Sequence, residues 1–194
     1  MGEPLALATR NRDKIREIAE LLAGRDIPLV TFLDVEGWPE VEETGSDFLE
    51  NALLKARAIS EVAGTRALAE DSGLEVMALG GAPGILSARY AGTDGDYEAN
   101  NRKLLQELAG CEPREREARF VCVAVLVEAD GTYREARGIM AGRIAKEPTG
   151  AAGFGYDPIF IPEGMNRTVA QLSPDEKNAI SHRGKALREL LPYL

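Results

Sequence analysis

Two segments in the last third of the chain carry residues suited to binding a flat ligand. Gly153-Phe154-Gly155-Tyr156-Asp157-Pro158 sets two aromatic rings among glycines, and Ser181-His182-Arg183-Gly184 is a compact polar cluster. Glycine allows close backbone approach, and aromatic faces stack on a base. Asp157, His182 and Arg183 offer polar groups that distinguish a 6-oxo from an amino group. The pattern predicts a purine nucleotide pocket; the alternative is a glycine turn beside aromatic core residues, followed by a helix break.

A second candidate site follows a short apolar run at residues 5–8. A strand that passes through a polar loop into a helix presents free N–H groups and the positive end of the helix dipole, which favour phosphate. The loop and the first helical turn add a hydroxyl, an amide, a carboxylate and cationic groups: Thr9, Arg10, Asn11, Arg12, Asp13 and Lys14. No GxxxxGK[ST] loop is present. The alternative is a capped amphipathic helix with solvated basic residues.

Acidic residues form a third set of candidates, Glu42, Glu43, Glu70 and Asp71. Converging carboxylates hold Mg²⁺ through one or two direct ligands, with waters and substrate phosphates completing the shell. His182 is the only histidine and the two cysteines are isolated, so a closed zinc site of nitrogen and sulfur ligands is excluded. The alternative is a solvated acidic surface.

In this order, the segments resemble the Ham1/inosine triphosphatase family over residues 8–186. The family pattern T-G-N-x-x-K is matched by Thr9, Asn11 and Lys14, with Arg10 in place of the usual glycine. The resemblance implies Mg²⁺-dependent hydrolysis of non-standard purine nucleotides such as ITP, dITP and XTP to the monophosphate and pyrophosphate. It also implies an elongated α/β protein whose mixed sheet is flanked by helices, with a central active-site cleft between two lobes, and a homodimer.

The resemblance also implies roles for individual residues. It assigns residues 9–14 and Lys55 to the triphosphate, Glu42 and Asp71 to the metal, and Asp71 to the general base. Ser72 would contact the substrate. The remaining nucleotide-binding positions, with Asp157 and Arg183 near the base, are Phe154, Gly155, Tyr156, Asp157, Lys177, His182 and Arg183.

The apolar pattern predicts the elements that position these residues. Strands are expected at residues 5–8, 67–69, 120–127 and 137–144, the last antiparallel to its neighbour after an Asp-Gly turn. Helices are expected from Asn11 to Gly24, from Ser46 to Gly64, over residues 100–108, and from a capping box at Ser173. Strands mixed with helices over 194 residues favour a single α/β domain, 1–194.

Composition narrows the possible partners and compartment. The net charge of −9 disfavours broad attraction to nucleic acid or anionic lipid, so we expect a small-molecule nucleotide as the partner, not nucleic acid or a membrane. No apolar run reaches the length of about 18 residues that a membrane span needs, and the start lacks the features of a signal peptide. Two cysteines without a paired spacing are expected to be free thiols in the cytoplasm.

Three other functions are compatible with parts of the pattern. A Maf-type pyrophosphatase would act on modified pyrimidine or 7-methylguanine nucleotides, and base preference separates it from the family above. A nucleotide sensor would bind without turnover, so release of pyrophosphate from dITP excludes it. A structural or interaction domain gives no reason for lysines, acids and glycine loops to occur together.

Overall fold

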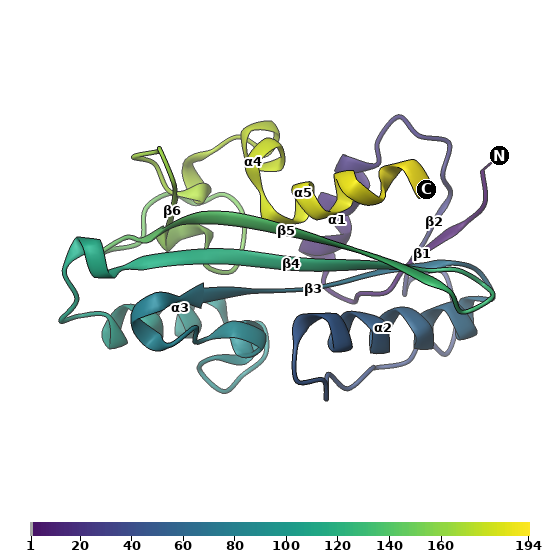
Figure 1. The fold of residues 1–194 in the computed structure, drawn as a ribbon, viewed down its shortest axis with the longest axis horizontal. Helices are drawn as coiled ribbons and strands as arrows, with labels where there is room; N and C mark the ends of the chain where they lie inside the picture. Colours follow the sequence, from purple (N-terminus) through teal and green to yellow (C-terminus); the bar gives the residue numbers. More distant parts are fainter. Residues whose placement is uncertain (1) are drawn as a thin grey trace. The chain divides into compact units, whose positions relative to one another are not determined.

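The computed structural model describes residues 2–194. Within them the strands form one mixed sheet of six in the order β2-β1-β3-β4-β5-β6, in which β1 is parallel to β2 and β3, and β5 is antiparallel to β6 (Figure 1). The strands are β1 Leu5–Leu7, β2 Leu29–Val30, β3 Ala67–Val76, β4 Glu117–Val127, β5 Tyr133–Ile144 and β6 Phe160–Pro162. The helices are α1 Arg12–Leu21, α2 Phe48–Ala63, α3 Tyr97–Glu107, α4 Pro174–Ile180 and α5 His182–Leu190. The predicted mixed α/β class is confirmed.

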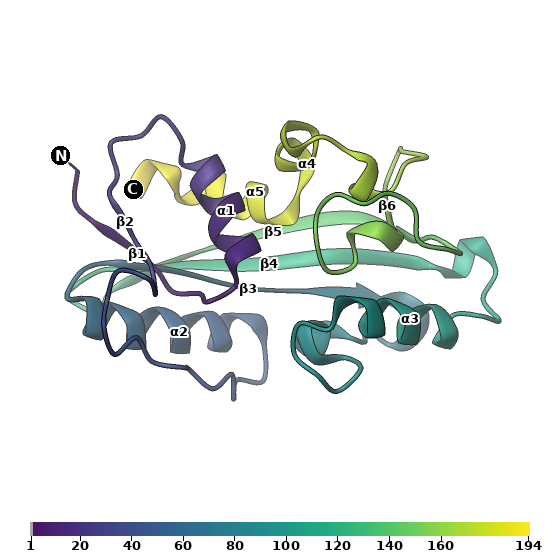
Figure 2. The ribbon, with the colours of Figure 1, turned by 180° about the vertical axis from the view of Figure 1, so that it is seen from behind.

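The chain divides into two compact units, and β3, β4 and β5 contribute residues to both. Unit 1 comprises Met1–Asp71, Cys122–Gly138 and Arg183–Leu194. In it, α1 and α5 cover one face of the sheet and α2 covers the other (Figure 2). Successive residues of β1 therefore enter different cores: Leu5 and Leu7 pack with α1 and α5, whereas Ala6 packs with α2. Burial on both faces explains why β1 is a continuous apolar run.

Unit 2 comprises Ser72–Val121 and Ile139–His182. Its core joins the ends of the long strands to α3 and to the segment after β5, through residues such as Leu74, Leu104, Phe120 and Phe160. Figure 2 shows α3 and α4 on opposite faces of this part of the sheet. Residues 153–158, the segment with two aromatic rings among glycines, lie entirely in this unit.

The starts of α1 and α4 follow the predicted caps. Asn11 Oδ1 accepts hydrogen bonds from the backbone N–H groups of Asp13 and Lys14, at 2.9 and 3.1 Å. Ser173 and Glu176 form the reciprocal capping box of α4. These signals are local to the sequence, so they are visible before the fold is known.

Several predicted boundaries are wrong, among them the starts of β4 and β5, which lie at Glu117 and Tyr133 and not at residues 120 and 137. β3 runs from Ala67 through Val76, so the acidic pair at Glu70 and Asp71 lies inside the strand and not after it. α3 begins at Tyr97, capped by Asp96, three residues before the predicted start, because the cap is polar and lies outside the apolar stripe. α1 ends at Leu21, before Gly24, which has a φ of 83° in the following turn.

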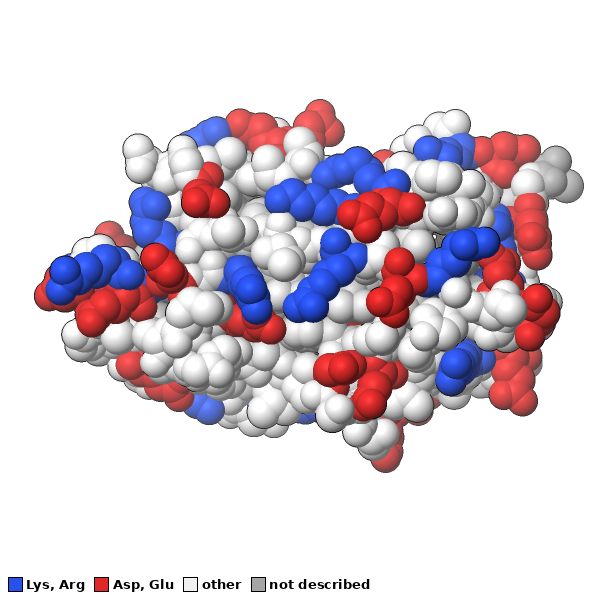
Figure 3. Space-filling view, in the orientation of Figure 1, with Lys and Arg blue, Asp and Glu red and all other residues white. Residues whose placement is uncertain are grey.

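Surface charge and the apolar length of the helices bear on whether the chain binds nucleic acid or a membrane. On the face that Figure 3 shows, basic and acidic side chains are interspersed. None of the helices formed by residues 2–194 is both long enough and apolar enough to cross a membrane.

Candidate functional site

The loop between β1 and α1 and the first turn of α1 carry the residues 9–14 that were predicted to bind phosphate. Thr9 Oγ1 accepts a hydrogen bond from the backbone N–H of Asn11 at 3.1 Å, and Asn11 in turn caps α1, so the loop is fixed by its own side chains. Arg10 donates to the carbonyl oxygen of Trp38 at 2.9 Å, and its guanidinium lies 5.9 Å from the ring centroid of Phe32. No non-glycine residue in the described chain has a positive φ, so the backbone at Arg10 does not need the glycine usual in the family pattern.

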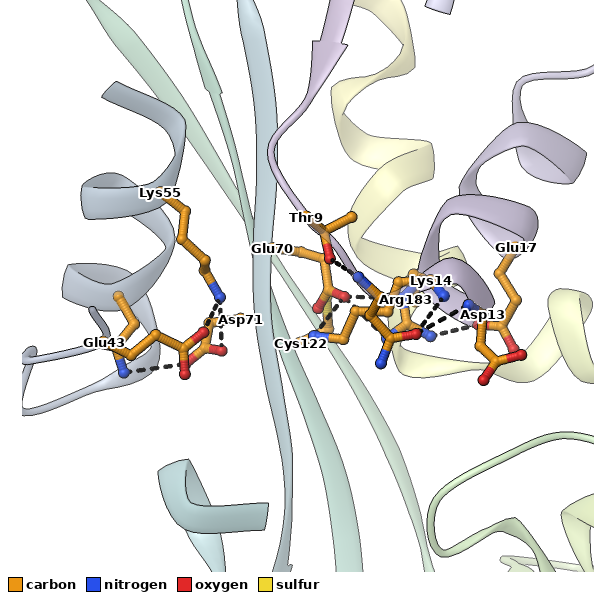
Figure 4. Close-up of polar contacts among 12 residues, drawn as sticks. Thr9, Asp13, Lys14, Glu17, Glu43, Lys55, Glu70, Asp71, Cys122 and Arg183 are labelled. Atoms are coloured by element: carbon orange, nitrogen blue, oxygen red, sulfur yellow. Dashed lines mark hydrogen bonds and ion pairs between the residues drawn. The ribbon is translucent and has the colours of Figure 1, made fainter. Parts of the chain in front are cut away.

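Glu70 and Asp71 are consecutive in β3, and their side chains point to opposite sides of the sheet (Figure 4). Both are buried, with exposed fractions of 1% and 5%. Glu70 therefore faces α1 and α5, whereas Asp71 faces α2. The alternation of the strand separates two adjacent carboxylates into two different environments.

On the Glu70 side, a buried ion network joins α1, β3 and α5. Glu70 Oε1 lies 2.9 Å from Lys14 Nζ and accepts from Arg183 Nη2 at 3.0 Å. Arg183 also donates to Glu17. Burial alone raises the pKa of Glu70, but Arg183 and the nearby lysines outweigh it and hold that pKa well below its usual range. Burial disfavours the charged form of Arg183, yet Glu70 and Glu17 outweigh this and raise its pKa. Both groups therefore stay ionised.

On the Asp71 side, α2 supplies two partners. Lys55 Nζ lies 3.0 Å from Asp71 Oδ1 and 2.7 Å from Glu43 Oε1, and Asn51 Nδ2 donates to Asp71 Oδ2 at 3.3 Å. Burial raises the pKa of Asp71 and the Glu43 charge adds to this, while Lys55 and Lys14 oppose it. The environments of Glu70 and Asp71 thus move the pKa values of two neighbouring carboxyls in opposite directions, and Asp71 is the better proton acceptor of the two.

The donor set around Asp71 suits a hard cation. Asp71 and Glu43 share the ammonium of one lysine, which shows that positive charge is favoured between the two carboxylates. Groups of three or more His, Cys, Asp or Glu side chains that would hold a metal are absent from residues 2–194. A cation here would therefore take one or two carboxylate oxygens and complete its shell with water and phosphate, as Mg²⁺ does. Glu42, the predicted ligand, lies exposed beside Glu43 in the loop before α2.

Unit 2 holds the predicted base-binding segment beside a pocket of about 770 Å³. Residues 148–158 form one wall and α3 forms the other, with Phe154 and Tyr97 at ring centroids 5.9 Å apart. Asp157 Oδ2 accepts from the backbone N–H of Phe154 at 2.9 Å and from Lys177 Nζ at 2.5 Å, and Lys177 Nζ lies 4.8 Å from the Phe154 ring centroid. Asp157 and Lys177 therefore position the aromatic wall.

Two predicted base-site residues are buried in the core of this unit. Tyr156 donates to the carbonyl oxygen of Ser87 at 2.9 Å. His182 stacks on Phe120 with ring centroids 4.7 Å apart and an angle of 9° between the rings. Ser72, in β3 beside Asp71, is partly exposed. The tyrosine and the histidine thus have the packing partners of core residues.

The two glycines that flank Phe154 provide a test of this wall. A Cβ at Gly153 would lie 2.0 Å from Asp157 Oδ2, whereas a Cβ at Gly155 would meet nothing within 4 Å. Both glycines have a positive φ, so alanine at either position costs about 1–2 kcal/mol in backbone strain. Gly153→Ala must also displace Asp157, which we expect to add about 1–3 kcal/mol of destabilisation.

We therefore expect Gly153→Ala to lower the stability more and to raise the KM for a purine triphosphate more than Gly155→Ala does. Urea unfolding and initial-rate kinetics on the two variants measure both effects. Equal effects from both substitutions would contradict a positioning role for Asp157.

The sequence-predicted residues thus fall into two groups. The group in unit 1 contains Thr9, Arg10, Asn11, Arg12, Asp13, Lys14, Glu42, Lys55, Asp71 and Arg183. The group in unit 2 contains Ser72, Phe154, Gly155, Tyr156, Asp157, Lys177 and His182. The sequence pattern named Glu43 and Glu70 only as candidate metal ligands, and it gave no role to Glu17, Asn51 or Asn101. No sequence signal marks Glu17, because an acid next to an apolar residue is common on an amphipathic helix and its partner Arg183 lies 166 positions away.

Comparisons with known proteins identify the family of this chain. Residues 5–193 match the Ham1 family. The dITP/XTP pyrophosphatases of Thioalkalivibrio sulfidiphilus and Streptomyces avermitilis are 53% and 52% identical to this chain, and each alignment covers 98% of this chain and at least 96% of the other protein. A solved structure of a HAM1 protein from Coxiella burnetii is 42% identical with a TM-score of 0.88, covering 99% of this chain and 98% of that one. This chain therefore belongs to the Ham1 family.

Proposed function

We propose that this chain is a nucleoside triphosphate pyrophosphatase that hydrolyses dITP, ITP and XTP to the monophosphate and pyrophosphate. The observation that carries the proposal is the buried Asp71, held by Lys55 and Asn51, with the carboxylate of Glu43 on the same lysine. That arrangement places a proton acceptor, Asp71, beside the ammonium of Lys55, whose positive charge would attract a phosphate. The relatives named dITP/XTP pyrophosphatase support the substrate class.

The chain's own groups account for the reaction as follows. Lys14 and Lys55 each offer an ammonium with three donors, so each keeps a donor for a phosphate oxygen beside its carboxylate contacts. Asp71 accepts a proton from the water that attacks the α-phosphorus, the bond to the bridging oxygen breaks, and pyrophosphate leaves. Asp71 and the acidic loop at Glu42 and Glu43 would hold Mg²⁺, which when bound offsets the triphosphate charge and polarises the water.

A nucleotide panel with Mg²⁺ tests the proposal directly. We expect dITP, ITP and XTP to be hydrolysed faster than dATP or dGTP, with pyrophosphate and not phosphate as the product, and chelation of the metal to stop turnover. Faster hydrolysis of 7-methyl-GTP or modified pyrimidine nucleotides would favour a Maf-type enzyme instead. Binding of dITP without turnover would favour a sensor.

Two further parts of the proposal concern the setting of the enzyme. A homodimer is proposed because the family resemblance implies one, and sedimentation of the purified protein tests it. The cytoplasm is proposed as the compartment because the substrates belong to the free nucleotide pool. A free nucleotide, and not nucleic acid, is the proposed partner, in keeping with the net charge of −9.

Lys14→Ala is expected to weaken triphosphate binding by about tenfold or more, because it removes one charge-assisted phosphate contact. Inosine without phosphates should bind almost as before. Titration calorimetry with both ligands measures the difference. The matched control is Arg16→Ala on the same helix, where the exposed guanidinium pairs with Asp13, three residues away, at 2.9 Å. Equal losses for inosine and ITP would instead assign Lys14 to the stability of the Glu70 network.

A further inference from the structure

Asn101 on α3 has a buried acceptor that the protein itself does not use. Its exposed fraction is 8%, and it lies in the wall of the pocket that α3 forms with residues 148–158. Nδ2 donates to the carbonyl oxygen of Gly155 at 3.0 Å. Oδ1 is buried and has no hydrogen-bond partner within the described chain. Buried side-chain acceptors are nearly always paired, so the unpaired Oδ1 needs an explanation, and a bound ligand that donates to it would supply one.

The orientation of the amide is fixed by its neighbour. If the Asn101 amide were turned over, Oδ1 would face the Gly155 carbonyl, and two acceptors would meet without a hydrogen atom between them. Nδ2 must therefore point at Gly155, and Oδ1 is the atom of this side chain that lacks a donor. Asn100, the preceding residue, differs: its Oδ1 accepts from Ala91 and its Nδ2 donates to Ala88, so it serves the fold.

The pocket around Asn101 limits what that donor can belong to. Phe154 and Tyr97 give it aromatic surface, and Leu105, Ala109 and Pro148 make much of the rest apolar. Aromatic walls favour a flat, conjugated ligand. A flat ligand that also presents an N–H in its ring plane fits both the aromatic wall and the unpaired Oδ1 of Asn101. A 6-oxopurine has such a group at N1, whereas adenine has a lone pair there.

We propose that Asn101 is a specificity-determining residue whose Oδ1 accepts the N1–H of a 6-oxopurine stacked against Phe154. This inference rests on the proposed nucleotide hydrolysis and names a contact for its base. With adenine, the N1 lone pair would face the Oδ1 lone pair, and both would stay unsatisfied. Guanine shares the N1–H, so this contact selects 6-oxopurines as a class and does not exclude GTP.

The test compares ITP with N1-methyl-ITP, in which a methyl group replaces the proton that Asn101 would bind. The wild type should prefer ITP in kcat/KM by about tenfold or more. Asn101→Ala removes the acceptor and leaves room for the methyl group, so the preference should fall to about threefold or less. Asn166→Ala is the matched control, because Asn166 is an exposed asparagine of the same unit outside the pocket wall, and it should keep the wild-type ratio.

Each result decides the proposal. Equal kcat/KM for ITP and N1-methyl-ITP in the wild type would overturn it, and this measurement does not depend on any variant folding. A ratio that Asn101→Ala leaves unchanged would also overturn it and leave Asn101 as an anchor for Gly155. Absence of ITP turnover in the wild type would instead contradict the proposed activity, so the two failures are distinguishable.

Discussion

Replacing Asp71 with asparagine is expected to lower kcat for dITP by roughly a hundredfold or more while the protein stays folded. Asparagine keeps the shape of the side chain and one oxygen, so a hydrogen bond from Asn51 or Lys55 survives. The substitution removes the charge and the proton acceptor together. Because both functions are assigned to one buried carboxylate, the loss should exceed that from any single phosphate contact.

The measurement is steady-state pyrophosphate release with dITP, paired with urea unfolding of each variant. Asp130→Asn is the matched control, since Asp130 is an exposed aspartate in the turn between β4 and β5, where it accepts from Thr132. Its kcat should equal that of the wild type. An Asp71→Asn variant with nearly normal kcat would remove Asp71 from the chemistry and require another proton acceptor.

The parts of the fold that the sequence predicts correctly depend on short-range signals. Asn11 and Ser173 cap helices through residues two or three positions away, and the amphipathic stripe of α2 identifies that helix and its end at Gly64. β3 was predicted too short because its apolar run stops at Ala69. The strand continues through Glu70 and Asp71 since lysine and arginine side chains from other elements compensate their buried charge. An apolar pattern contains no information on those partners.

The predictions for the candidate site divide in the same way, into residues that local motifs identify and residues whose role depends on distant partners. Thr9, Lys14, Lys55 and Asp71 follow from motif order, and the structure places all four in unit 1. The roles of Glu70, Glu17 and Asn101 do not follow, because each depends on a partner distant in the chain. Glu17 and Arg183 are separated by 166 positions, and Asn101 and Gly155 by 54. Separations of that size become contacts only when the strands have paired.

Arg183→Ala is expected to destabilise the protein by about 3–5 kcal/mol, because it removes one partner from a buried ion network. Arg183 is 2% exposed, and its guanidinium holds Glu70 through two nitrogens and Glu17 through a third. Without it, both carboxylates stay buried with too little compensating charge. A loss of this size is a large part of the stability of an ordinary domain, about 5–15 kcal/mol, so the variant should unfold at markedly lower urea.

Arg188→Ala separates this effect from the general cost of losing an arginine, since Arg188 is exposed on the same helix and its removal should cost at most about 1 kcal/mol. A third variant, Glu17→Gln with Arg183→Ala, should recover part of the loss, because it removes one of the two uncompensated charges.

The family resemblance places Arg183 near the base, and that remains a separate prediction. If Arg183→Ala unfolds at the same urea concentration as Arg188→Ala yet loses the preference for dITP over dATP, the guanidinium reads the base. If stability falls and the preference is kept, Arg183 acts by holding Glu70, and through it Lys14, in place.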